Sequence, residues 1–167
     1  ADLCTGSGCI AISTLVHRPD CRAVAVDISE SALAVAKVNA ESNLVSDRIT
    51  FIKNDITAEN ALGSSLFDAI ASNPPYINSG VIDTLQPEVL KEPRIALDGG
   101  SDGLDFYRSL IPRAAETGVL TDGGFVLFEV GAGEACAVAR MGADAGFSSE
   151  ILCDLGGIER TVILSRR

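Results

Sequence analysis

The sequence contains a single histidine, and none of its five cysteines form a Cys-x-x-Cys pair. Zinc sites are built mostly from cysteine and histidine ligands at short, regular spacings. The scarcity of these ligands argues against a metal centre, so no metal is expected in the functional site. An odd number of cysteines without such spacing is typical of a reducing compartment, and a cytoplasmic location is therefore expected.

Long apolar runs are also missing. No stretch approaches the roughly 18 consecutive apolar residues that a membrane-spanning helix needs, and nothing resembles a signal peptide. The 167 residues are nevertheless 47% hydrophobic and 22% charged, which is typical of a globular domain with a substantial core. The composition predicts one folded domain without attachment to a membrane.

Basic residues are few relative to acidic ones. The chain has 13 lysines and arginines against 23 aspartates and glutamates, and its formal net charge is −10. The basic residues are scattered, apart from the pair Arg166 and Arg167. Because a surface of this charge repels phosphate backbones, no direct binding of nucleic acid is expected.

Short apolar or β-branched runs alternate with helical patterns along the chain. The expected strands are residues 1–3, 22–27, 48–55, 67–72, 123–131, 148–154 and 160–166. The expected helices are residues 9–17, about 29–41 with Ser29 as N-cap, 103–117 and 133–146. This alternation predicts an α/β fold with right-handed crossovers and helices on both faces. The last two strands form a hairpin, so the seven-stranded sheet should be mostly parallel with an antiparallel end.

A glycine-rich turn joins the first strand to the first helix. The stretch "DLCTGSGCIA" contains Gly6-x-Gly8-x-x-Ala11, a pattern typical of nucleotide-binding strand–turn–helix units. Gly6 and Gly8 allow the backbone to turn tightly and to approach a ligand, which would meet the N–H groups at the start of the helix. The turn thus predicts a nucleotide-like cofactor.

Acidic residues follow the next two strands. Asp27 lies 19 residues after Gly8, where a carboxylate can accept hydrogen bonds from a ribose diol. Asp55 closes the third strand and is the natural partner of an adenine amine, and Ile56 can pack on the adenine ring. These features suit NAD and S-adenosylmethionine equally well.

The fourth strand ends in "SNPPY", on the same edge of the sheet as the glycine turn. The two prolines remove N–H donors and leave carbonyl acceptors. The Asn73 side-chain oxygen and the Pro74 carbonyl can accept hydrogen bonds from both N–H groups of a planar amine, against which Tyr76 can stack. Since this positioning directs the nitrogen lone pair at a methyl sulfonium, the corner favours S-adenosylmethionine.

The stretch from Asn73 to about Asp102 lacks clear periodicity and is too long for a passive connection in a compact domain. We expect it to be a lid or a substrate loop. Glu129 ends the fifth strand near the predicted site, where a structural role is favoured over a catalytic one.

The segments Asp2–Gly8 and Asn73–Tyr76, together with Asp27, resemble the class I methyltransferases that methylate planar nitrogens. The segment "EPRIALDGGSDGLDFYRSL" (Glu92–Leu110) is similar to that of the release-factor glutamine methyltransferases. In that family Glu-Pro, Ala-Leu, Gly-Gly and Asp-Gly-Leu recur in this order after Asn-Pro-Pro-Tyr. The stretches "FEVG" (Phe128–Gly131) and "GIERTVIL" also match, so the resemblance covers essentially the whole chain.

The resemblance implies a Rossmann-like class I methyltransferase fold and S-adenosyl-L-methionine as cofactor. The methyl group would be transferred to the glutamine side chain in the Gly-Gly-Gln loop of a bacterial peptide chain release factor. Together with Asp55, the residues then expected to bind the cofactor are Cys4, Thr5, Gly6, Ser7, Gly8, Asp27, Ile56 and Asn73. The residues expected to bind the glutamine are Asn73, Pro74, Pro75 and Tyr76, of which Asn73, Pro74 and Tyr76 are the catalytic candidates.

This sequence departs from the family pattern in two respects. Cys4 stands where glycine is more usual, although its backbone can serve the same role. Most of the first strand and the family's N-terminal helical domain, which helps to dock the release factor, are not within residues 1–167. The chain is therefore interpreted as a catalytic methyltransferase domain, and a monomer is expected.

Two alternatives stay open at this point. A nucleic-acid methyltransferase would use the same corner on an exocyclic amine of adenine or guanine. It would need a basic channel for the nucleic-acid backbone, and the net charge of −10 argues against one. A nucleotide-binding module or dehydrogenase would keep the glycine turn but would not need Asn-Pro-Pro-Tyr.

Overall fold

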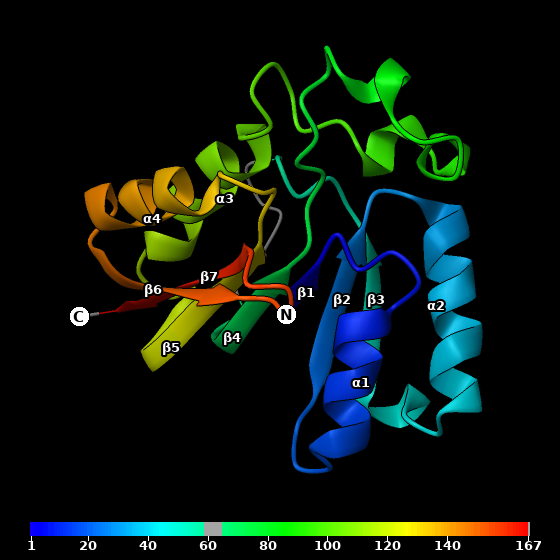
Figure 1. Cartoon of the computed structure of the whole chain (residues 1–167). Helices are drawn as coiled ribbons and strands as arrows, with labels where there is room; N and C mark the ends of the chain where they lie inside the picture. The colour runs from blue at the N-terminus through cyan, green and yellow to red at the C-terminus, as the bar shows by residue number, and fades with distance from the viewer. Residues whose placement is uncertain (59–64, 167) are drawn as a thin grey trace.

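The computed structural model describes residues 1–58 and 65–166. Within these residues, seven strands form one sheet in the order β3-β2-β1-β4-β5-β7-β6 (Figure 1). The strands are β1 (Asp2–Leu3), β2 (Ala23–Asp27), β3 (Ile49–Lys53), β4 (Phe67–Ser72), β5 (Leu120–Glu129), β6 (Phe147–Cys153) and β7 (Glu159–Arg166). The α-helices are α1 (Cys9–His17), α2 (Glu30–Ser42), α3 (Asp105–Ala115) and α4 (Ala135–Asp144). None of the described helices has the length and apolar character needed to cross a membrane.

The directions of the strands confirm the predicted mixed sheet. Strands β1 to β5 pair in parallel, whereas β7 pairs antiparallel with both β5 and β6. The terminal hairpin is therefore present, and it contributes the antiparallel end. Strand β5 begins at Leu120, earlier than the expected residue 123, and its pairing with β4 is irregular near that end.

The shortest strand, β1, lies between β2 and β4 in the interior of the sheet. Leu3 is level with Val26 of β2 on one side and with Ser72 of β4 on the other. Because the three strands are parallel, Cys4 and Asn73, which follow β1 and β4, lie at the same edge of the sheet as Asp27, the last residue of β2. The register alone therefore places three predicted site residues next to one another.

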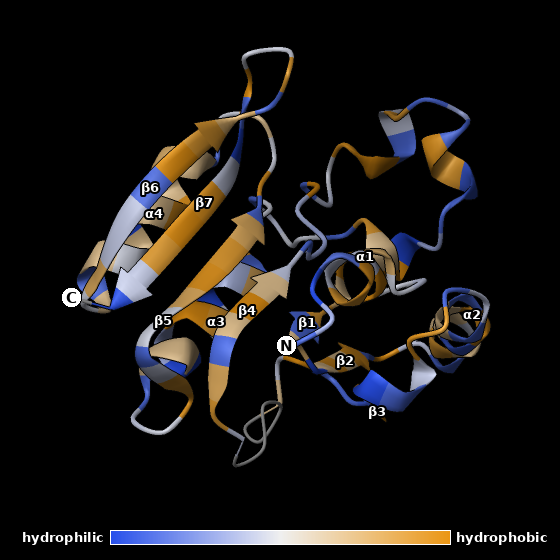
Figure 2. Ribbon diagram, turned by 90° about the horizontal axis from the view of Figure 1, so that it is seen from below, coloured by the Kyte–Doolittle hydropathy of each residue, from blue (hydrophilic) through white to orange (hydrophobic). Residues whose placement is uncertain are grey.

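Alternate residues of β2 belong to two different cores. Val24 and Val26 pack in the larger core, which includes buried residues of α3 and α4. Ala23 and Ala25 pack in a smaller core with residues of α1 and α2. Since successive side chains of a strand point to opposite faces of the sheet, the two helix pairs cover opposite faces, as predicted. Figure 2 shows long apolar stretches in β5 and β7.

Helix α2 begins where the sequence predicts. The Ser29 side chain accepts a hydrogen bond from the Ala32 N–H at 3.2 Å, which identifies Ser29 as the N-cap.

The segment between β4 and α3 contains three short 3-10 helices: η2 (Ile82–Thr84), η3 (Val89–Lys91) and η4 (Arg94–Ala96). In Figure 1 this segment, drawn in green, lies beyond the carboxyl ends of the parallel strands. An isolated bridge between Ile77 and Asp98 joins its two ends. The segment is thus a closed loop over the edge where the site is predicted.

Tyr107 of α3 anchors that helix to the end of β5. Its side chain is fully buried, and its ring meets Phe128 edge-on with centroids 5.3 Å apart. Its hydroxyl donates a hydrogen bond to the Glu129 carbonyl at 2.7 Å. The contact combines ring packing with the pairing of a backbone acceptor.

Replacing Tyr107 by phenylalanine keeps the ring but removes the donor to the Glu129 carbonyl. We expect Tyr107→Phe to lower the free energy of unfolding by about 1–2 kcal/mol, measured by urea denaturation. Tyr107→Leu also removes the edge-on ring contact and should cost more. Equal stability of the wild type and Tyr107→Phe would show that the hydrogen bond contributes nothing.

Candidate functional site

A cavity of about 450 Å³ lies at the carboxyl edge of the parallel strands. This volume is within the range of small-molecule sites. Seven of the predicted site residues line it: Cys4, Gly6, Asp27, Asp55, Ile56, Asn73 and Pro75. The other five, Thr5, Ser7, Gly8, Pro74 and Tyr76, lie outside its lining.

The Asp27 carboxylate joins the glycine turn to the start of α2. Its Oδ2 accepts a hydrogen bond from the Gly6 N–H, and its Oδ1 accepts one from the Ser29 N–H, both at 2.8 Å. Each carboxylate oxygen has a further lone pair. Asp27 can therefore hold the turn in place and still accept hydrogen bonds from the hydroxyls of a ligand.

Asp55 shapes the turn that follows β3. Its Oδ1 accepts hydrogen bonds from the Thr57 hydroxyl at 2.6 Å and from the Thr57 N–H at 2.8 Å, and these contacts lower the pKa of Asp55. Arg113 of α3 donates to the Ile56 carbonyl at 2.9 Å and also to the carbonyls of Thr57 and Ala58. The turn that carries Asp55 and Ile56 is thus held by a cation from α3, whose buried residues pack in the same core as Ile56.

Cys4 adopts the backbone conformation that glycine favours. Its φ is 59°, in the left-handed region that glycine adopts without strain. Burial, and then the charge of Asp27, raise the pKa of the Cys4 thiol to about 12. The thiol therefore stays protonated and poorly nucleophilic in the cavity.

Thr5 has a structural contact. Its hydroxyl donates to Asp2 Oδ2 at 2.6 Å, and the same oxygen accepts the Ala11 N–H at 3.0 Å. Asp2 is buried, which raises its pKa, and its other oxygen has no partner within the described residues. Thr5 and Asp2 therefore connect the glycine turn to the first turn of α1.

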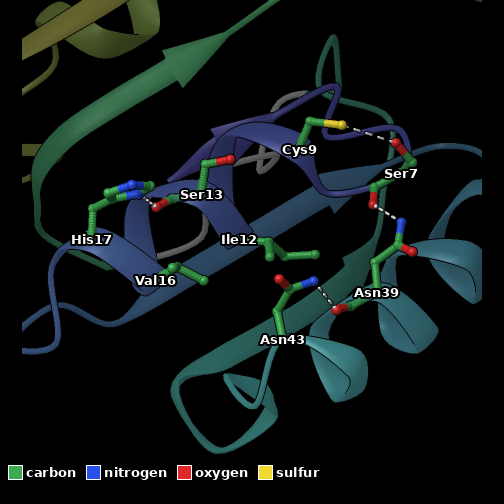
Figure 3. A pocket seen from close by; sticks show the side chains of 8 residues that line it. All are labelled: Ser7, Cys9, Ile12, Ser13, Val16, His17, Asn39 and Asn43. Carbon is green, nitrogen blue, oxygen red and sulfur yellow. Dashed lines mark hydrogen bonds between the residues drawn. The ribbon is translucent and has the colours of Figure 1, made fainter.

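Ser7 and Gly8 face the helices. Figure 3 shows Ser7 in a groove between α1 and α2, where its hydroxyl lies 3.3 Å from the Cys9 sulfur and its carbonyl accepts Asn39 Nδ2 at 2.9 Å. A Cβ on Gly8 would lie 2.7 Å from Ile12 Cδ1. Glycine at position 8 is thus explained by its left-handed φ of 86° and by tight helix packing.

The corner after β4 places an exposed amide beside two buried prolines. Asn73 is exposed at the cavity, whereas Pro74 and Pro75 are buried. Tyr76 is partly buried, and its hydroxyl donates to Glu129 Oε1 at 3.4 Å. Burial, and then the Glu129 carboxylate, raise the pKa of Tyr76, so the phenol stays neutral. Glu129 thus contacts the corner through Tyr76, which is a specific partner for the structural role predicted for Glu129.

A close backbone contact supports this corner from behind. The Ile77 N–H donates to the Leu97 carbonyl at 2.9 Å, and the Gly99 N–H donates to the Ile77 carbonyl at 2.8 Å. A Cβ on Gly99 would lie 2.7 Å from the Tyr76 Cα and 2.8 Å from the Pro75 carbonyl oxygen. Only glycine fits between these backbone atoms, which explains the first glycine of the Gly-Gly pair.

The structure adds cavity residues that sequence reasoning missed. Ile28, 44% exposed, lines the cavity directly after Asp27, and an apolar residue beyond a strand end was a usable signal. Four more come from the loop and from α3, where no pattern marked them: Pro93, Ile95, Ala96 and Phe106. The rest of the lining comes from residues next to Asp27 and Asp55 in the sequence or from the first turn of α2: Ser29, Ala32, Asn54 and Thr57. Among the residues that the structure describes, no group of three or more His, Cys, Asp or Glu side chains is placed to hold a metal.

The strand order, the antiparallel end and the cavity at the strand termini together define the architecture of a class I methyltransferase. A solved methyltransferase from Pyrococcus furiosus shares this fold with a TM-score of 0.72 at 20% identity, covering 99% of this chain and 74% of that one. The family model described as methyltransferase small domain matches residues 1–101. The chain belongs to the methyltransferase small domain family.

Two curated relatives are similar over most of the chain. A protein of Geobacter sulfurreducens named release factor glutamine methyltransferase is 43% identical over 163 residues, which are 96% of this chain and 55% of that protein. A protein of Bradyrhizobium diazoefficiens named ribosomal protein uL3 glutamine methyltransferase is 42% identical over 132 residues, 79% of this chain and 40% of that protein. The chain thus spans about half the length of the curated relatives that it matches.

A methyl group at position 99 would push the corner out of place. We expect Gly99→Ala to lower methyl transfer by about 10²-fold, because small displacements at a reacting centre have effects of this size. The measurement is transfer from labelled S-adenosylmethionine, with circular dichroism to verify the fold.

Gly80→Ala is the matched control in the same loop. A Cβ there would meet one side-chain atom, Asn78 Oδ1, at 3.2 Å. This variant should keep nearly wild-type transfer. Equal activity of the Gly99 and Gly80 variants would contradict the supporting role of Gly99.

Proposed function

We propose that the domain transfers a methyl group from S-adenosyl-L-methionine to a glutamine side-chain nitrogen of a cytoplasmic protein. The acceptor we propose is the glutamine in the Gly-Gly-Gln loop of a peptide chain release factor. The observation that carries the proposal is that Asn73 and Pro75 line the same cavity as Asp27 and Asp55. An amide-binding corner thereby adjoins a nucleoside-binding wall. The names of several curated relatives support the acceptor.

The cavity residues suit the nucleoside half of this cofactor. Asp27 offers carboxylate acceptors for the ribose hydroxyls, and Asp55 has a second oxygen, Oδ2, for the adenine amine. Ile56 provides an apolar wall, and Gly6 has no atom within 4 Å of the place where a Cβ would be, so the backbone there is open to a ligand. The cofactor, when bound, supplies an electrophilic methyl group on a positively charged sulfur.

The corner can orient an acceptor nitrogen that reacts poorly by itself. An amide nitrogen is a poor nucleophile because its lone pair is delocalised into the carbonyl group. Asn73 Oδ1 and the Pro74 carbonyl accept its two N–H groups and so orient the lone pair, while Tyr76 stacks on the planar amide. The lone pair of the amide nitrogen would form the new bond to the methyl carbon. The electrons of the carbon–sulfur bond would stay on the sulfur, and the amide proton would leave to water. Positioning of this kind can supply about 7–11 kcal/mol.

A second acceptor, a glutamine of ribosomal protein uL3, is suggested by relatives with that name at 42–43% identity. Those relatives match 78–79% of the chain, against 96–100% for the relatives named after release factors, which favours the release factor. The net charge of −10 disfavours a nucleic-acid amine. Labelled-methyl assays with release factor, uL3 and nucleic acid should label the release factor most rapidly.

The proposed role of Asp27 predicts the choice of cofactor. The wild type should bind S-adenosylhomocysteine in calorimetry and show negligible binding of NAD. Asp27→Ala should weaken S-adenosylhomocysteine binding by about 1.5–3 kcal/mol, from the loss of hydrogen bonds to a charged group. Asp27→Asn, which keeps one acceptor oxygen, should bind more tightly than Asp27→Ala. Tight binding of NAD would overturn the proposed function.

The proposed role of Asn73 predicts a loss of turnover without loss of the cofactor. Asn73→Ala should reduce the transfer rate by about 10²–10³, as does removal of a preorganised hydrogen-bonding group elsewhere. We further propose that the Asn73 amine donates to the glutamine carbonyl, so Asn73→Asp should be equally poor, because its charge repels that oxygen. Affinity for S-adenosylhomocysteine should stay nearly unchanged in both variants. Wild-type turnover of Asn73→Ala would show that the corner is merely a loop.

A further inference from the structure

Three large apolar side chains are exposed in the loop between β4 and α3. Val81 is 46% exposed, Leu90 45% and Ile95 57%. Ile95 differs from the other two because it lines the cavity, whereas Val81 and Leu90 do not. Exposed apolar side chains that are scattered on a surface need no explanation, but one within a ligand-sized cavity indicates a surface that a ligand covers.

The cavity has apolar side chains from segments far apart in the chain. Ile28 and Ala32 come from the end of β2 and the start of α2, and Pro93, Ile95 and Ala96 come from η4 and the residue before it. The carboxylates of Asp27 and Asp55, which suit the sugar and the base of a nucleoside, lie in the same lining. A nucleoside held by these carboxylates would therefore have the loop residues as a further wall.

The loop wall is tied to the substrate corner by charged contacts. Arg94, next to Ile95, pairs with Asp83 at 3.1 Å and with Asp98 at 3.4 Å, and donates to the Ser79 carbonyl at 3.3 Å. Asp98 accepts the Gly100 N–H at 3.1 Å and the Ser79 hydroxyl. These contacts connect η4 to the chain that packs directly behind Tyr76.

We propose that Ile95, with Pro93 and Ala96, is an outer wall of the cofactor site and packs on the apolar surface of the bound nucleoside. Covering this wall fixes η4, and through Arg94 and Asp98 it fixes the backbone that supports the Asn73–Tyr76 corner. Cofactor binding therefore prepares the acceptor site, and binding at the two sites is coupled. The inference rests on the proposed function, since it takes S-adenosylmethionine as the ligand.

The test compares the replacement of an aliphatic side chain by serine on two neighbouring 3-10 helices, η3 and η4. Ile95→Ser removes apolar area from the cavity, and Leu90→Ser is the matched control because Leu90 is similarly exposed but outside the lining. Calorimetry with S-adenosylhomocysteine should show about tenfold weaker binding to Ile95→Ser, the size expected for loss of a partly buried aliphatic contact. Leu90→Ser should change the Kd less than about twofold. Ile95→Val should fall between the wild type and Ile95→Ser.

Amide hydrogen exchange gives a second measurement, which reports on the loop itself. S-adenosylhomocysteine should slow exchange over residues 89–100 in the wild type and in Leu90→Ser, and should slow it less in Ile95→Ser at equal saturation.

The possible failures are distinguishable. If the wild type does not bind S-adenosylhomocysteine, the proposed function falls. If the wild type binds S-adenosylhomocysteine and the two serine variants bind it with equal affinity, this inference alone is overturned. The same holds if hydrogen exchange in the loop does not change when the ligand binds.

Discussion

The site depends on the register of β1 between β2 and β4. Leu3 lies level with Val26 and with Ser72, and the Thr5 N–H continues the pairing to the Val26 carbonyl at 3.0 Å. The glycine turn, Asp27 and the corner at Asn73 therefore lie next to one another at the carboxyl edge of the sheet. A slip of a single residue would turn each strand side chain to the other face of the sheet and would separate the turn from its carboxylate.

Backbone groups hold the acidic side chains of the cavity in position. Asp27 accepts two N–H groups, and Asp55 accepts the N–H and the hydroxyl of Thr57. The same carboxylates have lone pairs left for a ligand, so the structural and binding roles of these residues are compatible. This double use gives a site that is formed before the ligand arrives, which lowers the entropic cost of binding. Arg113 of α3 supports the turn after β3 through the Ile56 carbonyl.

Local patterns in the sequence determined the helices and strands, the cofactor edge of the site and the stiffness of the Asn73–Tyr76 corner. The alternation of apolar runs predicted the seven strands, and Ser29 predicted the start of α2, because periodicity and capping act within a few residues. The glycine turn and the spacing to Asp27 predicted the cofactor edge, since carboxyl ends of parallel strands meet there. The Asn-Pro-Pro-Tyr stretch predicted a stiff corner from the backbone restrictions of proline alone.

The tertiary structure decided which residues meet across long stretches of chain. Packing against β5 brought Glu129 to Tyr76, and the folding of the loop brought Ile95 to the wall that contains Asp27. Packing also showed that Gly8 serves the contact between α1 and α2, and that Gly99 leaves room for Tyr76. None of these contacts follows from periodicity, because each depends on how a non-periodic loop or a helix is seated on the sheet, and that is set by the sum of many distant contacts.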